Sequence, residues 1–279
     1  IFSNRHGGDM TDNPAGFTGD IPFHYDSGLG PNIFHAYADD IAARVAQISA
    51  GNVLELAAGS GIVSRRLRDA LAPDTKLVVT DLNGPMLAVA RQKFQPHEAV
   101  EFATADAMNL PFDDSTFDVI VCQFGVMFFP DVVASYREAL RVLRPGGRYI
   151  LSTWGSMTDN PFSQVAHETA ARFFPDNPPG FYRVPFSHDD PQKVSQQLRD
   201  AGMLNISHET IDLTRVVTDM GEFAKGLVFG NPLVDDILRR GGVTPEEVRQ
   251  AIEDTLVGRF GAAPAEMPLR AIVFDGRAA

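Results

Sequence analysis

Cysteine is nearly absent from this sequence, because Cys122 is the one thiol among 279 residues. A single thiol excludes an internal disulfide, and it excludes a zinc site built from several cysteines. Cys122 stands inside an apolar run, where a cysteine usually packs as a small hydrophobic side chain. We therefore expect Cys122 to be buried and to have no chemical role.

Long hydrophobic runs and blocks of positive charge are missing as well. No stretch approaches the ~20 apolar residues of a membrane-spanning helix, and no signal-peptide pattern begins the chain. Lys and Arg number 24 against 36 Asp and Glu, which gives a net charge of −12. The basic residues are dispersed, so a nucleic-acid or anionic-membrane partner is disfavoured, although the charge can also serve solubility alone. We expect a cytoplasmic protein with a small-molecule partner.

The feature around which the chain is organised is a strand, a tight turn and a helix. An apolar run that contains Glu55 ends at a segment of small residues, 57–61, which includes Gly59 and Gly61. Residues 62–71 then read as a helix. Because the turn lacks bulk, a ligand can lie on its backbone, and the helix N-terminus directs free N–H groups toward that ligand.

The strand-then-helix rhythm continues up to Trp154 and then breaks. The pattern predicts strands at 52–56, 76–81, 100–104, 117–123 and 148–153, and helices at 33–47, 62–71, 85–94 and 131–142. Short apolar strands that alternate with helices predict an α/β fold, a doubly wound Rossmann-like sheet covered on both faces. Such a sheet binds ligands beyond the carboxyl ends of its strands.

The chain divides into four parts in this interpretation. Residues 1–32 form an N-terminal arm, with 11–32 expected as a loop and 1–9 read as added sequence ahead of a native start at Met10. Residues 33–154 form the core, 155–190 a cap insertion, and 191–279 complete the sheet with a second cap insertion at 214–266. Later helices are expected at 162–174, 191–201, 220–240 and 245–257, and later strands at 204–213 and 269–274.

Two kinds of nucleotide-binding turn compete for residues 55–64. A nicotinamide dinucleotide site requires G-x-G-x-x-G, and Ser64 occupies the position of its third glycine. An oxidoreductase is therefore disfavoured. The other pattern is E-x-G-x-G-x-G, of which the chain has Glu55, Gly59 and Gly61, with Ala57 in place of the first glycine.

Four segments in the right order, of which this turn is the first, identify the second pattern. They read VLELAAGSG at 53–61, VVTDLNGPML at 78–87, ADAMNLPF at 105–112, and FDVIVCQFG at 117–125 followed by LRPGG at 143–147. With these segments the chain resembles the class I S-adenosylmethionine-dependent methyltransferases, over about residues 50–154. It is most similar to the small-molecule branch of quinone and sterol C-methyltransferases, the methyltransferase type 11 domain. The resemblance implies a seven-stranded, mostly parallel sheet whose last strand is antiparallel, with a cap.

The resemblance also implies S-adenosylmethionine as the cofactor, and roles for single residues follow from its chemistry. Asp81 would accept the two ribose hydroxyls, or alternatively cap a helix. Asp106 would accept the adenine amine, or alternatively only form a turn. Glu55 would hold the glycine turn near the methionine amine, and Tyr25 would either bond the methionine carboxylate or simply pack. The complete set predicted to bind cofactor is Tyr25, Glu55, Ala57, Gly59, Gly61, Asp81, Leu82, Met86, Asp106, Ala107, Met108, Gln123 and Phe124.

The acceptor is expected to be small and hydrophobic or aromatic. The aromatic residues predicted to line its pocket are Trp154, Phe162, Phe181 and Phe229, with Phe174 and Phe186 as further candidates. These side chains could equally form the core of the cap. No catalytic acid or base and no metal site stands out, and the histidines that qualify by chemistry alone are His24, His35, His167 and His188.

The sequence therefore predicts methyl transfer from S-adenosylmethionine to such an acceptor. The alternative is a catalytically silent binding or assembly protein with the methyltransferase fold. The identity of the acceptor, the atom that is methylated and the oligomeric state stay open.

Overall fold

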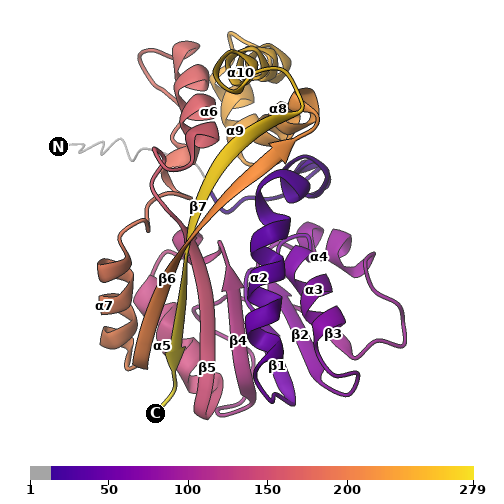
Figure 1. Cartoon of the computed structure of the whole chain (residues 1–279), viewed down its shortest axis with the longest axis vertical. Helices are drawn as coiled ribbons and strands as arrows, with labels where there is room; N and C mark the ends of the chain where they lie inside the picture. Colours follow the sequence, from indigo (N-terminus) through magenta and orange to yellow (C-terminus); the bar gives the residue numbers. More distant parts are fainter. Residues whose placement is uncertain (1–13) are drawn as a thin grey trace, which may run out of the picture.

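The computed structural model describes residues 14–279 (Figure 1). The expectation that residues 1–9 precede a native start at Met10 lies outside the described residues. Within residues 14–279, no helix combines the length and the apolar character that a bilayer-spanning segment needs.

A seven-stranded sheet forms the centre of the molecule, in the order β3-β2-β1-β4-β5-β7-β6. Its strands are β1 (Asn52–Glu55), β2 (Lys76–Asp81), β3 (Val100–Thr104), β4 (Phe117–Gln123), β5 (Leu143–Trp154), β6 (Leu204–Val217) and β7 (Ala265–Arg277). Only β7 is antiparallel to its neighbours, β5 and β6. The predicted doubly wound, mostly parallel sheet with an antiparallel last strand is therefore confirmed.

Helices cover both faces of the sheet (Figure 1). They are α2 (His35–Ala46), α3 (Ile62–Ala70) and α4 (Gly84–Arg91) on one face, and α5 (Val132–Val142) and α7 (Pro191–Ala201) on the other. Successive strand residues point to opposite faces, so Val53 packs beneath α2 and α3 while Leu54 packs beneath α5. Cys122 is fully buried in the second cluster, as expected.

A cap of four helices stands above the sheet (Figure 1). These are α6 (Pro161–Arg172), α8 (Met220–Phe229), α9 (Leu233–Arg240) and α10 (Pro245–Phe260). The strands β6 and β7 are longer than predicted, and they run as a paired ribbon from the sheet into the cap. At the start of α10, Thr244 and Glu247 form the reciprocal capping pair, with Glu247 N donating to Thr244 Oγ1 at 3.2 Å.

The single helix predicted over 220–240 is wrong, because the chain breaks between α8 and α9. Pro232 has no N–H to continue a helical ladder, and Asn231 Oδ1 accepts the N–H of Leu233 at 3.0 Å instead. The break matters for the site, since it turns Asn231 inward to a fraction exposed of only 3%.

The loop predicted over 11–32 is also wrong from Ile21 onward. The segment forms α1 (Ile21–His24) and then η1 (Tyr25–Phe34), a π-helix that leads directly into α2. Its glycines and Pro31 favour a loop locally, but Leu29 and Ile33 are buried in the main core. Tertiary burial of these side chains outweighs the poor local helix propensity.

Candidate functional site

A cavity of about 610 Å³ opens at the carboxyl ends of the central strands and continues against the cap. Cavities of roughly 300–1,000 Å³ are typical of small-molecule sites. The strand order reverses its direction between β1 and β4, and this cavity lies beyond the ends of those two strands. That is the place where doubly wound sheets bind ligands.

Most of the predicted site residues line this cavity. They are Tyr25, Ala57, Gly59, Asp81, Leu82, Met86, Asp106, Ala107, Met108, Gln123, Phe124, Trp154, Phe162 and Phe181. Four predicted residues, Glu55, Gly61, Phe174 and Phe229, do not line it, whereas the further candidate Phe186 does. None of the candidate histidines His24, His35, His167 and His188 lies on its wall either.

The turn after β1 approaches the ligand space with its backbone. Gly59 has a φ of 57° and Gly61 a φ of 78°, in the left-handed region that glycine tolerates best. A Cβ on Gly61 would lie 2.8 Å from the Cβ of Ala90, so this glycine allows α3 and α4 to pack closely. Gly61 therefore supports the turn from behind, whereas Gly59 faces the cavity. Ala57 takes a φ of 50° in spite of its side chain.

Asp81 closes the turn from the end of β2. Its Oδ2 accepts the N–H of Gly59 at 2.8 Å, and its Oδ1 accepts the N–H of Asn83 at 2.8 Å. Burial raises the pKa of this carboxyl, while the hydrogen bonds from Asn83 and Gly59 oppose the rise. The N-cap of α4 is Asn83, so the alternative of a helix cap is not what holds Asp81 in place. A carboxylate has about four lone-pair sites, so two remain beyond the two backbone donors, and the Asn83 side-chain amide occupies one of these by donating to Oδ1 at 3.3 Å.

The next strand end carries Asp106, whose Oδ1 accepts the N–H of Met108 at 2.9 Å. This is the turn-forming contact that the sequence left as the alternative, and it uses one of the two carboxylate oxygens. Met86, only 3% exposed, and Leu82, 59% exposed, also face the cavity. The two apolar side chains and the second oxygen of Asp106 suit a flat ring that carries an amine.

The other half of the cavity is aromatic. The rings of Phe124 and Trp154 stack in parallel with centroids 3.9 Å apart. Phe34, Phe162 and Phe186 surround the Trp154 ring at centroid distances of 6.1, 6.2 and 5.9 Å. Phe124 has a φ of 52°, an unusual conformation for a bulky residue, and its N–H donates to Ser152 O at 3.0 Å.

Several residues of this half were missed by the sequence reasoning. They are Phe17, Leu29, Ile33, Phe34, Met127, Phe128, Phe129, Tyr182, Pro185, Leu227 and Asn231. Leu29 could not be found because residues 11–32 were expected as a loop, and Ile33 and Phe34 were expected only as the start of a helix over 33–47. Both cap insertions contribute to the wall, through Phe181 and Tyr182 in one and Leu227 in the other.

Phe229 was expected in this pocket and lies outside it. Its ring packs on the ring of His24, with centroids 5.7 Å apart. Two residues along an α-helix correspond to about 200° of rotation, so the helix orientation that brings Leu227 to the cavity turns Phe229 away from it.

Only Asp81 and Asp106 carry charge among the residues lining the cavity within 14–279.

Tyr25 covers the turn from the side of η1. A Cβ on Gly59 would lie 3.9 Å from Tyr25 Cε1, and the Tyr25 ring stacks on Phe34 at 4.8 Å. Burial, together with the nearby carboxylates of Asp81 and Asp26, raises the pKa of the Tyr25 phenol. The side chain is therefore a neutral hydroxyl that can donate a hydrogen bond, and it packs as well.

Two buried polar groups near the turn have unused hydrogen-bonding capacity. Glu55 is 2% exposed, and burial raises its pKa to about 8, with Asp81 adding to the rise and Ser64 opposing it. Within the described chain, neither Glu55 Oε2 nor Gln123 Oε1 has a hydrogen-bond partner. Gln123 lines the cavity where its two halves meet, so its amide oxygen can accept from a bound ligand. Residues 14–279 contain no group of three or more His, Cys, Asp or Glu side chains that could hold a metal ion.

Comparison with known proteins gives the following matches. The model of the ubiE/COQ5 methyltransferase family matches residues 29–176. The chain is 37% identical over 106 residues to a ubiquinone/menaquinone biosynthesis C-methyltransferase UbiE of Bartonella tribocorum, covering 37% of this chain and 41% of that one. It is 38% identical over 107 residues to a demethylmenaquinone methyltransferase of Clavibacter sepedonicus, covering 38% of this chain and 42% of that one. The chain thus spans less than half the length of these curated relatives.

Among solved structures, the fold is similar to that of phosphoethanolamine N-methyltransferase 2 of Haemonchus contortus in complex with S-adenosyl-L-methionine. The TM-score is 0.57 at 16% sequence identity, over 92% of this chain and 56% of that chain. At this level of identity, the similarity concerns the fold alone.

Proposed function

We propose a function for this chain on the premise that it belongs to the ubiE/COQ5 methyltransferase family, whose model matches over half of its residues. The chain transfers a methyl group from S-adenosylmethionine to a small, uncharged aromatic acceptor. The observation that carries the proposal is a cavity with two unlike halves. One half has the glycine turn and two carboxylates at successive strand ends, and the other is walled by aromatic rings without charge.

The first half fits S-adenosylmethionine group by group. Asp81 accepts the ribose hydroxyls with the lone pairs that its backbone donors leave free. Asp106 accepts the adenine amine, and the ring lies between Leu82 and Met86. Gln123 Oε1, buried without a partner among the described residues, accepts from the amine at the methionine end. The cofactor supplies a methyl group on a sulfonium, which is already activated for displacement.

The aromatic half holds the acceptor and excludes water. A methyl transfer needs donor and acceptor aligned at ~3 Å, and positioning of this kind can supply most of the rate. The stacked rings of Phe124 and Trp154 give a flat surface for an aromatic acceptor. A charged acceptor would be desolvated here without a counter-charge, because both carboxylates of the wall lie in the other half.

The relatives narrow the acceptor class. One is named as a C-methyltransferase of ubiquinone/menaquinone biosynthesis and the other as a demethylmenaquinone methyltransferase, so we propose a reduced, quinone-type ring methylated on carbon. Within residues 14–279 no histidine or lysine lines the cavity, and Tyr25 has a raised pKa. These side chains therefore do not supply a base that could deprotonate the acceptor, so the acceptor has to be nucleophilic already when it binds. The net charge of −12 supports a small-molecule partner over nucleic acid, and a cytoplasmic location stays a prediction.

The proposal is tested in two steps. Calorimetry with S-adenosylmethionine, S-adenosylhomocysteine and NAD should show binding of the first two, and binding of NAD alone would refute the cofactor. Mass spectrometry should then detect a methyl group added to a demethylated hydroquinone acceptor. Cofactor binding without transfer to any such ring would favour the catalytically silent alternative.

A further inference from the structure

Asp26 joins the N-terminal arm to the turn after β1. Its Oδ1 accepts from Ser60 Oγ at 2.7 Å, and its two oxygens lie 2.7 and 2.6 Å from Lys93 Nζ. None of these three residues lines the cavity. We infer that Asp26 is a positioning residue, which holds η1 closed over the glycine turn and so sets how long the cofactor stays bound. The inference rests on the proposed function.

The turn side of this contact is rigid. Ser60 stands between Gly59 and Gly61 and is 1% exposed. Gly59 is bonded to Asp81, so the turn that receives Asp26 is already fixed on β2.

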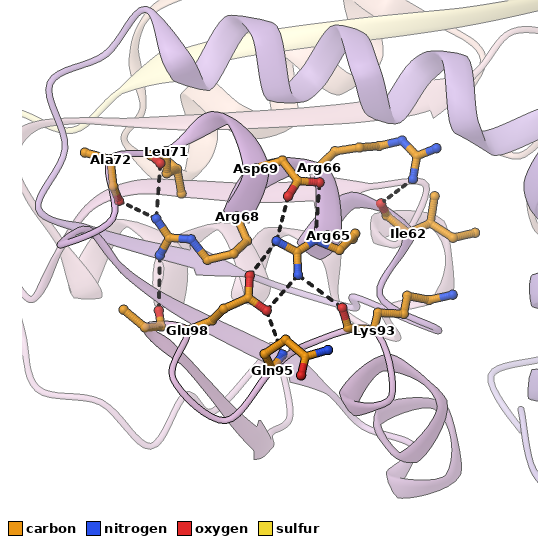
Figure 2. A network of polar contacts seen from close by, with 11 residues as sticks. Ile62, Arg65, Arg66, Arg68, Asp69, Leu71, Ala72, Lys93, Gln95 and Glu98 are labelled. Atoms are coloured by element: carbon orange, nitrogen blue, oxygen red, sulfur yellow. Dashed lines mark hydrogen bonds and ion pairs between the residues drawn. The ribbon is translucent and has the colours of Figure 1, made fainter.

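The lysine side is held as firmly. Figure 2 shows Arg65 of α3 donating to the Lys93 backbone carbonyl, at 3.1 Å, and clasping Glu98 with two nitrogens at 2.9 and 2.7 Å. The Lys93 side chain runs away from this network (Figure 2), and its ammonium group reaches Asp26. Lys93 is therefore fixed at its backbone before it bonds the arm.

The consequence of this contact falls on Tyr25, the residue next to Asp26. Its ring lies over Gly59 and stacks on Phe34, which belongs to the same helix. A ligand that lies on the backbone of Gly59 is therefore covered by Tyr25 as long as Asp26 keeps its partners. Release requires η1 to move, and this movement breaks the ion pair and the bond to Ser60.

A second contact keeps the arm folded without Asp26. A Cβ on Gly28 would lie 2.7 Å from Gly226 Cα, and a Cβ on Gly226 would lie 2.8 Å from Gly28 C. The backbones of η1 and α8 thus touch directly, and Leu29 and Ile33 are buried beside them. Asp26→Asn should therefore fold, with its effect confined to the mobility of the arm.

The test compares the rate at which S-adenosylhomocysteine dissociates from four forms of the full chain: wild type, Asp26→Asn, Lys93→Met and the double variant. The matched control is Glu101→Gln, which removes the exposed ion pair with Lys76 at the far edge of the sheet. S-adenosylhomocysteine should dissociate about tenfold faster from Asp26→Asn than from wild type, as expected for the loss of a charge-assisted bond. From the double variant the ligand should dissociate no more than twice as fast as from Asp26→Asn, because the two substitutions break the same contact. The control should match wild type.

Hydrogen exchange of the ligand-free protein gives an independent readout. Amides of residues 21–34 should exchange faster in Asp26→Asn than in wild type. In Glu101→Gln their exchange rates should equal those of wild type. Dissociation rates within twofold of wild type, or unchanged exchange in residues 21–34, would overturn the inference. Failure of the wild type to bind S-adenosylhomocysteine would instead refute the proposed cofactor, and the exchange result would then decide alone whether Asp26 closes the arm.

Discussion

The buried carboxyl of Glu55 should make the stability of the protein depend on pH. Its carboxyl is buried in β1, its Oε2 has no partner among residues 14–279, and its pKa is raised to about 8 from an ordinary value of 4.5. The folded chain therefore keeps the proton up to about pH 8, whereas the unfolded chain loses it near pH 4.5. Where the folded state binds more protons, the free energy of unfolding falls as pH rises. The contribution of Glu55 is thus fully present below about pH 4.5 and is lost by about pH 8.

Glu55→Gln removes this proton while it keeps the size of the side chain. At about 1.4 kcal/mol per pKa unit, the difference between 4.5 and about 8 corresponds to on the order of 5 kcal/mol. The variant's free energy of unfolding, minus that of wild type, should therefore rise from pH 5 to pH 8 and level off above. Its slope cannot exceed about 1.4 kcal/mol per pH unit, the limit for one proton.

Urea unfolding of both proteins at pH 5, 6, 7, 8 and 9 measures this difference, and all groups that titrate alike in the two proteins cancel. Glu98→Gln is the control. Arg65 holds the pKa of Glu98 at about 2 in the folded chain, so Glu98 is ionised above pH 5 in the folded and the unfolded chain alike. The difference in free energy of unfolding between Glu98→Gln and wild type should therefore not change with pH. A Glu55→Gln difference that changes by less than about 0.5 kcal/mol between pH 5 and 8 would mean that Glu55 is ionised when folded, and the reasoning from burial would fail.

Three further predictions concern the cavity wall. Asp81→Ala should weaken S-adenosylhomocysteine binding by on the order of 1.5–3 kcal/mol, and it should lower the melting temperature too, because Gly59 N loses its acceptor; calorimetry that finds an affinity within twofold of wild type would contradict this role. Ala57→Gly should raise the free energy of unfolding by roughly 0.5–1 kcal/mol, since relief from a φ of 50° exceeds the entropy cost of glycine; a decrease in urea unfolding would argue against strain there. Phe181→Ala should reduce acceptor turnover at least about tenfold with cofactor affinity unchanged. Phe229 is a cap residue outside the cavity, so Phe229→Ala should keep the turnover of wild type. Equal effects of the two substitutions on initial rates would show that the cap acts only through its stability.

The sheet and its ligand-facing strand ends were predictable because they are encoded locally. An apolar strand of four to seven residues, closed by Asp81 or by the turn at Gly59, repeats the same signal along the chain. The carboxyl ends of parallel strands must meet at one edge of the sheet, so Asp81, Asp106 and Gln123 were brought together by topology alone. Side-chain contacts between distant segments were not needed for that part of the site.

The arm and the break in the cap could not be predicted in the same way. Residues 25–34 contain two glycines and a proline, a composition that favours a loop, and they become a π-helix because Leu29 and Ile33 find a core to pack in. That core includes α8, which comes some two hundred residues later in the chain and whose backbone touches that of η1 where Gly28 and Gly226 lack side chains. A pattern within one segment carries no information about such a partner.

The two unusual backbone conformations at the cavity show how its halves are joined. Ala57 and Phe124 follow β1 and β4, neighbouring strands, and both have positive φ although neither is glycine. A Cβ on Gly125 would lie 2.6 Å from Ala57 Cβ, so the two strand ends press against each other and a larger residue is excluded at Gly125. Left-handed residues of this kind cost on the order of 1–3 kcal/mol each and persist only where the surroundings hold them. For Phe124 the surroundings are the stacked Trp154 ring, and an aromatic pair contributes about 0.5–1.5 kcal/mol beyond its buried area. The strain therefore places an aromatic face beside the backbone that is proposed to receive the cofactor, and a relaxed Phe124 would separate the methyl donor from the ring that holds its acceptor.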